Sequence, residues 1–221
     1  MLCFGAASML RSFILNVLAC AVCLVVVGTG LVVVSGFETS GEEDLRQCTD
    51  WPREAPLSLD RSRTTLLMFA HPRCPCTRAS LEELKTVLAR FPAKVSAQIL
   101  FLSPSRKPGA WTLTDSWREA TKIPGLTIRY DTDGYLAGLF GAENSGEVLL
   151  YAPHGKLLFR GGITRGRGET GMNSSEAALV SAIEGAISPD ALVPTPVYGC
   201  TLGLRYETAQ LGTAARAEFC H

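Results

Sequence analysis

Apolar and polar positions along residues 64–187 repeat with two periods, one typical of strands and one typical of helices. Residues 64–70 (TTLLMFA) form an apolar run that is typical of a buried central strand. Residues 79–91 then place Leu81, Leu84 and Leu88 at helical spacing, and Pro92 ends that pattern. The remaining expected elements are strand 94–103, helix 113–123, strand 126–131, helix 134–142, a hairpin over 147–162 and helix 173–187.

The order of these elements predicts an α/β fold. Strands that are separated by helices favour parallel pairing through crossovers, whereas a hairpin adds an antiparallel pair. We therefore expect a mixed sheet of about five strands with helices on both faces. In the helix over 113–123, Ser116 and Glu119 have the spacing of a capping box.

The N-terminal region holds an uncharged apolar stretch from Phe13 to Val34. As a helix it would be about 33 Å long, enough to cross a bilayer core of about 30 Å. It also exceeds the apolar core of a cleaved signal peptide, so we predict an uncleaved transmembrane helix. A lipoprotein signal at Cys20 is the weaker alternative, because further apolar residues follow it. Arg11 before the stretch predicts a cytoplasmic N-terminus and a soluble part on the periplasmic face of a bacterial inner membrane.

The expected organisation therefore has five parts. They are a short cytoplasmic segment (1–12), a transmembrane helix (13–34), a polar tether (35–57), a folded α/β domain (58–190) and an irregular, proline-containing tail (191–221).

Charge and glycine patterns exclude two classes of partner. Lys and Arg number 21 and Asp and Glu number 21, so the net charge is zero, which argues against a nucleic-acid partner. Residues 166–171 (GRGETG) match a dinucleotide-binding glycine pattern. They precede the last helix, however, and no parallel strand follows, so the required β-α-β unit is missing.

The chain has eight cysteines, of which three lie in or near the apolar stretch. The five others are Cys48, Cys74, Cys76, Cys200 and Cys220. Because five is odd, complete internal pairing would leave one thiol over. Cys200 is either a resolving thiol that the tail brings back to Cys74 or a structural disulfide partner of Cys48 or Cys220. We favour the structural disulfide.

Cys74 and Cys76 lie where the strand over 64–70 gives way to a helix. We expect Cys74 to be the N-cap residue and Pro75 to occupy the first helical position, where its missing N–H is tolerated. A Cys74 thiolate would then accept hydrogen bonds from the N–H groups of Cys76 and Thr77 at the positive end of the helix. Such a position lowers a thiol pKa and makes the cysteine a nucleophile.

Positively charged side chains surround this pair in the sequence, namely His71, Arg73 and Arg78. A disulfide between Cys74 and Cys76 would close a very small ring, and strained, exposed disulfides are labile and oxidising. His71, Cys74 and Cys76 also form a soft ligand set that suits Cu(I) or Zn. Redox exchange and metal binding therefore both remain open from the residues alone.

Three segments, HPRCPCTRASLEEL, GEVLLYAPHGKLLFRGGIT and TPVYGC, resemble the thioredoxin superfamily. Within it they are similar to the TlpA-type and peroxiredoxin-like branch, and in particular to RedB-type membrane-anchored bacterial proteins. The resemblance covers residues 55–203. It implies a thioredoxin-like fold, no cofactor, and exchange with protein thiols and disulfides and with a membrane redox partner.

The chain departs from the family pattern at three positions. Thr77 stands where the second cysteine of the family's Cys-x-x-Cys motif would lie, so Cys76 must resolve from one residue closer. Gly146 stands near the position of the proline that faces the active cysteine in the family, and the loss of that proline keeps metal binding open. His71 stands where peroxiredoxins have threonine, which disfavours a peroxidase.

The sequence thus predicts a membrane-anchored thioredoxin-like protein in which Cys74 attacks a disulfide and Cys76 resolves the mixed disulfide. Two alternatives remain. One is a copper-binding or copper-delivery module that uses His71, Cys74 and Cys76, and the other is a redox-inert interaction domain.

Overall fold

The computed structural model describes residues 13–29, 49–105, 111–186, 192 and 194–202, and the chain divides into two units, Met1–Arg46 and Gln47–His221. In the first unit, residues 13–29 form a helix with exposed apolar side chains. None of the helices in these described ranges combines the length and the apolar character that spanning a membrane requires. The transmembrane helix predicted over 13–34 is therefore not confirmed, and residues 30–34 of that prediction lie outside the described ranges.

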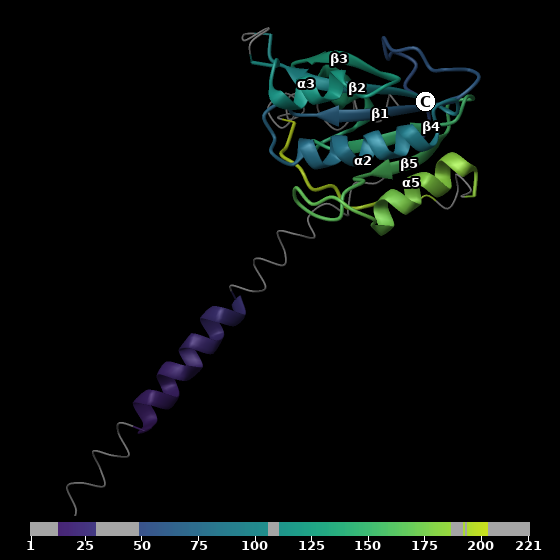
Figure 1. Cartoon of the computed structure of the whole chain (residues 1–221). Helices are drawn as coiled ribbons and strands as arrows, with labels where there is room; N and C mark the ends of the chain where they lie inside the picture. The colour runs from purple at the N-terminus through teal and green to yellow at the C-terminus, as the bar shows by residue number, and fades with distance from the viewer. Residues whose placement is uncertain (1–12, 30–48, 106–110, 187–191, 193, 203–221) are drawn as a thin grey trace, which may run out of the picture. The chain divides into compact units, whose positions relative to one another are not determined.

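The second unit is built on one five-stranded sheet with the strand order β3-β2-β1-β4-β5 (Figure 1). Its strands are β1 (Thr64–Ala70), β2 (Val95–Ser103), β3 (Leu126–Thr132), β4 (Glu147–Tyr151) and β5 (Leu157–Gly161). Its helices are α2 (Thr77–Arg90), α3 (Asp115–Thr121), α4 (Tyr135–Phe140) and α5 (Ser174–Glu184). This is a thioredoxin-like α/β arrangement, and each element lies where the hydrophobic pattern predicts it.

The direction of β4 differs from the prediction. β2 pairs parallel with both β1 and β3, as expected for strands joined by crossover helices. β4 follows a helix as well, yet it pairs antiparallel with β1. Gly141 ends α4 in the left-handed conformation with φ 65°, which glycine adopts without strain, and the chain turns there. The hairpin of β4 and β5 then adds to the free edge of β1.

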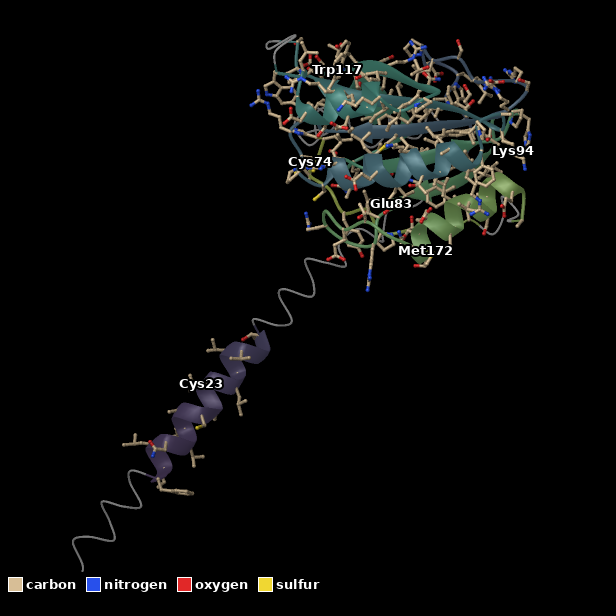
Figure 2. The ribbon with its side chains drawn as sticks, viewed as in Figure 1. Cys23, Cys74, Glu83, Lys94, Trp117 and Met172 are labelled. Carbon is tan, nitrogen blue, oxygen red and sulfur yellow. The ribbon has the colours of Figure 1, made fainter. Side chains whose placement is uncertain are left out.

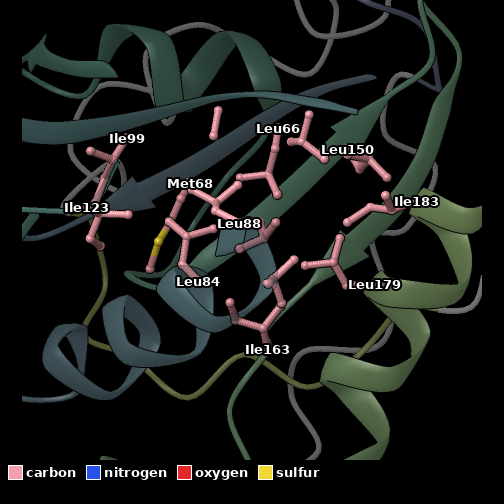
Figure 3. Packing of buried hydrophobic residues seen from close by; sticks show 14 of the residues in the cluster. Leu66, Met68, Leu84, Leu88, Ile99, Ile123, Leu150, Ile163, Leu179 and Ile183 are labelled. Atoms are coloured by element: carbon pink, nitrogen blue, oxygen red, sulfur yellow. The ribbon is translucent and has the colours of Figure 1, made fainter. Parts of the chain in front are cut away.

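The core has two layers because successive side chains of β1 point to opposite faces of the sheet. Leu66 and Met68 pack against α2 and α5, where they meet Leu84 and Leu179 (Figure 3). Phe69 points the other way, into a second cluster that includes residues of α4. Burial of one such side chain stabilises the fold by about 1.5–3 kcal/mol. Because apolar side chains lie on both faces of the sheet, both faces must be covered by helices.

The packed unit begins earlier than residue 58, where the sequence pattern places the domain boundary. Asp50 pairs with Lys156 in an antiparallel bridge. Trp51 packs edge-on against Phe140 and Tyr151, with ring centroids 5.1 Å apart in both cases. Leu57 is buried. Residues 50–57, which the sequence assigns to the tether, therefore belong to the packed unit.

Two helix starts also differ from their predictions. The N-cap residue of α2 is Cys76, not Cys74, and its own dihedral angles are already helical. The N-cap of α3 is Thr114, whose side chain accepts a hydrogen bond from the N–H of Trp117, so the capping box of Ser116 is not formed. The hydroxyl of Thr114 also donates to the carbonyl of Pro72 at 2.8 Å, a contact that no local pattern reveals.

Candidate functional site

The candidate site lies between the end of β1 and the start of α2, where Cys74 is found (Figure 2). Two backbone bonds fold this connection into tight turns: the N–H of Cys74 donates to the carbonyl of His71 at 3.0 Å, and the N–H of Thr77 donates to the carbonyl of Cys74 at 3.2 Å. Pro75 is exposed within the second turn. These turns bury the side chains of both Cys74 and Cys76.

The loop before β4 forms the opposite wall of the site. Ser145 accepts from the N–H of His71 at 2.9 Å, and its hydroxyl lies 2.9 Å from that of Thr77. Thr77 also donates to the carbonyl of His71 at 3.1 Å. Thr77, at the position of the missing family cysteine, is thus a buried residue that fixes the turn to this wall.

Gly146 follows Ser145 and has a geometric requirement of its own. Its φ is +91°, and a Cβ there would lie 2.8 Å from the hydroxyl oxygen of Ser80. Its N–H donates to the carbonyl of Phe69 at the end of β1, at 2.8 Å. Glycine therefore allows the loop to approach α2 closely and holds Ser145 next to the cysteine turn.

The C-terminal segment brings a third cysteine to this wall. Thr201 pairs with Asn144 in an antiparallel bridge, and the N–H of Ser145 donates to the carbonyl of Cys200 at 2.8 Å. The N–H of Cys200 in turn donates to Sγ of Cys74 at 3.3 Å. Among the described residues Cys200 is a free cysteine, and the structural disulfide that we favoured from the sequence stays a prediction. Its two expected partners, Cys48 and Cys220, lie outside the described residues.

Cys74 is the most acidic of the three thiols. Burial, the largest single influence, raises its pKa. Hydrogen bonds from the backbone and thiol of Cys200, the backbone of Cys76 and the side chain of Ser145 act in the opposite direction and together hold the pKa below its ordinary value. Hydrogen bonds to an anion favour the charged form, so Cys74 is the thiol of this cluster that ionises most readily.

Cys76 and Cys200 are the thiols that remain protonated. Burial raises the pKa of Cys76, and the charge of Cys74 and a hydrogen bond to it raise it further. The pKa of Cys200 is raised to about 11, chiefly by its hydrogen bond to Cys74 and then by burial and by the charges of Cys74 and Cys76. Arg167 opposes both shifts, and the backbone of Gly168 lowers the pKa of Cys76. The most acidic thiol of the cluster, Cys74, is thus flanked by two thiols that are weaker acids.

The predicted positive charges play a smaller part than the sequence suggested. Burial, followed by the nearby charge of Arg73, lowers the pKa of His71, so its imidazole is disfavoured as a cation. Its Nδ1 accepts from the N–H of Arg73 at 3.1 Å, and its ring packs edge-on against Trp111. The guanidinium of Arg73 lies 5.3 Å from the centre of the same indole ring. The influences that lower the pKa of Cys74 are hydrogen bonds rather than a cationic His71.

The structure gives the alternative metal site no support. Within the described ranges, no group of three or more His, Cys, Asp or Glu side chains is placed to hold a metal ion. His71, Cys74 and Cys76 are close in sequence, but Nδ1 of His71 faces the backbone of Arg73.

Four residues of the site escaped the sequence analysis: Trp111, Ser145, Arg167 and Gly168. Ser145 adjoins Gly146, but its contact with Cys74 depends on how β4 pairs with β1. Arg167 and Gly168 belong to the glycine-rich stretch that was rejected as a dinucleotide site, and they lie beside Cys76 instead. No local signal marks Trp111.

No protein-family model matches this chain, and no curated protein matches it significantly. Among solved structures, a hypothetical protein from Sinorhizobium meliloti is similar, with 18% identity, a TM-score of 0.51 and coverage of 65% of this chain and 80% of that one. An uncharacterized conserved protein from Geobacillus kaustophilus has 20% identity and a TM-score of 0.49 over 64% of this chain and 77% of that one. A secreted Mycobacterium tuberculosis disulfide oxidoreductase has 18% identity and a TM-score of 0.39 over 57% and 84%. The first likeness shows a shared fold only, so the TlpA-type or RedB-type branch remains a prediction.

Proposed function

We propose that this protein carries out thiol–disulfide exchange with protein thiols and disulfides, and that Cys74 is the attacking residue. One observation carries the proposal: the buried sulfur of Cys74 accepts a backbone hydrogen bond at 3.3 Å, and its pKa lies below the ordinary value. A thiolate, not a thiol, is the nucleophile in disulfide exchange. A buried cysteine without such donors would have a raised pKa and would be inert.

The proposed reaction begins when the Cys74 thiolate attacks one sulfur of a partner disulfide. A mixed disulfide forms, and the other partner sulfur leaves as a thiolate that takes up a proton. A neighbouring thiol of the cluster then loses its proton and attacks Sγ of Cys74. The second partner sulfur leaves as a thiol, so the partner gains two electrons and the protein loses two. The sequence assigns this resolving step to Cys76.

The experiment measures the first step alone. The purified full chain is mixed with the aromatic disulfide DTNB, and release of the first thionitrobenzoate is followed in a stopped-flow instrument. We expect a fast phase in the wild type. In Cys74→Ser this phase should be lost, and the remaining release should be at least about tenfold slower, because each unit by which a pKa falls raises the thiolate fraction about tenfold near neutral pH. The matched control is Cys23→Ser, which alters an exposed cysteine of the other unit and should leave the fast phase intact.

A fast phase that persists in Cys74→Ser would contradict the proposal and favour a redox-inert interaction domain. Modification of Cys74 that is no faster than modification of the exposed Cys23 would have the same meaning.

We further propose, from the uncharged stretch Phe13–Val34 alone, that the chain is anchored in the inner membrane with its redox unit outside the cytoplasm. Disulfide chemistry suits that compartment, and a membrane redox partner would reset Cys74 there. Carbonate washing of membranes should leave the full chain in the pellet. Changing Val25 and Val26 together to Arg should release it, whereas Val25→Leu should not. A wild-type chain found in the washed supernatant would refute the anchor.

A further inference from the structure

The C-terminal strap, as we call residues 194–202, is held against the redox unit at both of its ends. Near its start, the N–H of Thr195 donates to the carbonyl of Arg160 at 3.2 Å, and the hydroxyl of Thr195 donates to the carbonyl of Gly162 at 2.7 Å. At its end, Leu202 is buried, and its N–H donates to the carbonyl of Glu143 at 2.8 Å. Cys200 lies between these two anchor points.

Gly199 makes this placement of Cys200 possible. A Cβ at position 199 would lie 1.8 Å from the carbonyl oxygen of Ser145, which is backbone and cannot rotate away. Glycine is therefore required where the strap crosses the wall of the site. The close approach allows the backbone of Cys200 to bond to Ser145 on one side and to Cys74 on the other.

Resting on the proposed function, we propose that Cys200 is the resolving cysteine and that oxidation links Cys74 to Cys200. The two residues are 126 positions apart in the chain, yet the N–H of Cys200 touches Sγ of Cys74 and its thiol is hydrogen-bonded to the same sulfur. A bond between them joins two segments that already lie together. A bond from Cys74 to Cys76 would instead have to close a very small ring inside a turn that backbone hydrogen bonds hold.

The order of the chemical steps also favours Cys200 over Cys76. In the resting cluster, the leading cause of the raised pKa of Cys200 is its hydrogen bond to the Cys74 thiolate. A mixed disulfide on Cys74 removes that negative charge, so Cys200 becomes more acidic at the stage when a nucleophile is needed. For Cys76 the leading cause is burial, which the mixed disulfide does not remove.

The resolving step is written as follows. The thiol of Cys200 gives its proton to solvent, and its sulfur attacks Sγ of Cys74 in the mixed disulfide. The bond between Cys74 and the partner sulfur breaks, and the partner leaves as a thiolate that takes up a proton. The Cys74–Cys200 disulfide forms, so the two protein cysteines lose two electrons together and the partner disulfide gains them.

The test follows the second release of thionitrobenzoate from the full chain after one equivalent of DTNB, with Cys74→Ser as the background for the remaining cysteines. We expect Cys76→Ser to keep the second release within about threefold of wild type, and Cys200→Ser to slow it at least about tenfold. The first release in Cys200→Ser should still depend on Cys74, because serine keeps the backbone N–H that bonds to Cys74. After alkylation and digestion, mass spectrometry of Cys76→Ser should show Cys74 linked to Cys200.

Two kinds of failure are distinguishable in this assay. If the first release does not depend on Cys74, the proposed function fails. If the first release depends on Cys74 but the second survives Cys200→Ser, the inference about Cys200 is overturned and the proposed function stands.

A second pair of variants tests the strap without altering any cysteine. Gly199→Ala should force the strap away from Ser145, slow the second release at least about tenfold and remove the Cys74–Cys200 link. Gly138→Ala is the matched control, because a Cβ at this position in α4 meets nothing within 4 Å. A second release that is equally fast in both variants would show that the seated strap does not deliver Cys200, and would overturn the inference.

Discussion

The buried ion pair beside the site allows a quantitative prediction. Nη2 of Arg160 lies 2.8 Å from Oε1 of Glu147, and the two side chains are only 8% and 6% exposed. Arg160 also donates to the carbonyls of Phe140 and Gly141, and Glu147 accepts from the N–H of Glu143 at 3.0 Å. The pair therefore fixes the loop that continues to Ser145 and to the strap.

The perturbation is Arg160→Met, which keeps the volume and removes the charge. At an effective dielectric constant of about 20, the attraction across 2.8 Å is about 6 kcal/mol, and desolvation of the two ions offsets most of it. Removal of one partner leaves the other charge buried without compensation. We expect the free energy of unfolding to fall by about 3–5 kcal/mol at pH 8.

The loss should depend on pH with a definite sign. Burial already raises the pKa of Glu147 above its ordinary 4.5, although Arg160 opposes the shift. Without Arg160 the pKa rises further, so the folded variant holds a proton that the unfolded chain has released. The cost relative to wild type therefore grows as the pH rises through the wild-type pKa of Glu147, which lies above 4.5, toward the higher pKa of the variant, by at most about 1.4 kcal/mol per pH unit.

The assay is urea unfolding of the full chain at pH 5 and pH 8, followed by circular dichroism. The control is Glu147→Gln, which keeps an acceptor for Arg160 and titrates at neither pH, so its cost relative to wild type should not grow from pH 5 to pH 8. An Arg160→Met cost that is below about 1 kcal/mol, or equal at the two pH values, would refute the reasoning.

Three further predictions concern the cysteine turn. Cys200→Pro removes the N–H that bonds to Cys74, whereas Cys200→Ala keeps it. A hydrogen bond to a charged group is worth about 1.5–3 kcal/mol, so the pKa of Cys74 should be about one to two units higher in the proline variant than in the alanine variant. The pKa is read from the rate of iodoacetamide alkylation against pH. Equal midpoints in the two variants would contradict the role of that N–H. His71→Ala should leave the midpoint within about half a unit of wild type, and a rise of about one unit or more would restore a cationic role for His71. Thr77→Val removes the hydroxyl that bonds to the carbonyl of His71 and to the hydroxyl of Ser145, and it should lower the free energy of unfolding by about 1–3 kcal/mol. Thr77→Ser keeps a hydroxyl and should cost less. Equal costs would show that these hydrogen bonds contribute little.

The sequence by itself determined the elements of the fold and the main candidate nucleophile. The apolar run over 64–70 is β1, and the helical spacing of Leu81, Leu84 and Leu88 lies within α2. These patterns are reliable because hydrophobic periodicity is a property of neighbouring residues and survives in any packed fold. Cys74 was singled out for the same reason, since a cysteine between a strand and a helix is visible in a short window.

Only the tertiary structure decided how the site is assembled. The antiparallel entry of β4 depends on which edge of the sheet is free, so the order of elements predicted its direction wrongly. The start of α2 at Thr77 depends on Ser145, which lies 68 positions away. Cys200 looked like a structural disulfide partner because its meeting with Cys74 spans 126 positions and passes through backbone bonds to the loop before β4. Those bonds join segments that are far apart in the sequence, so no local pattern encodes the contact with Cys200 that helps to lower the pKa of Cys74.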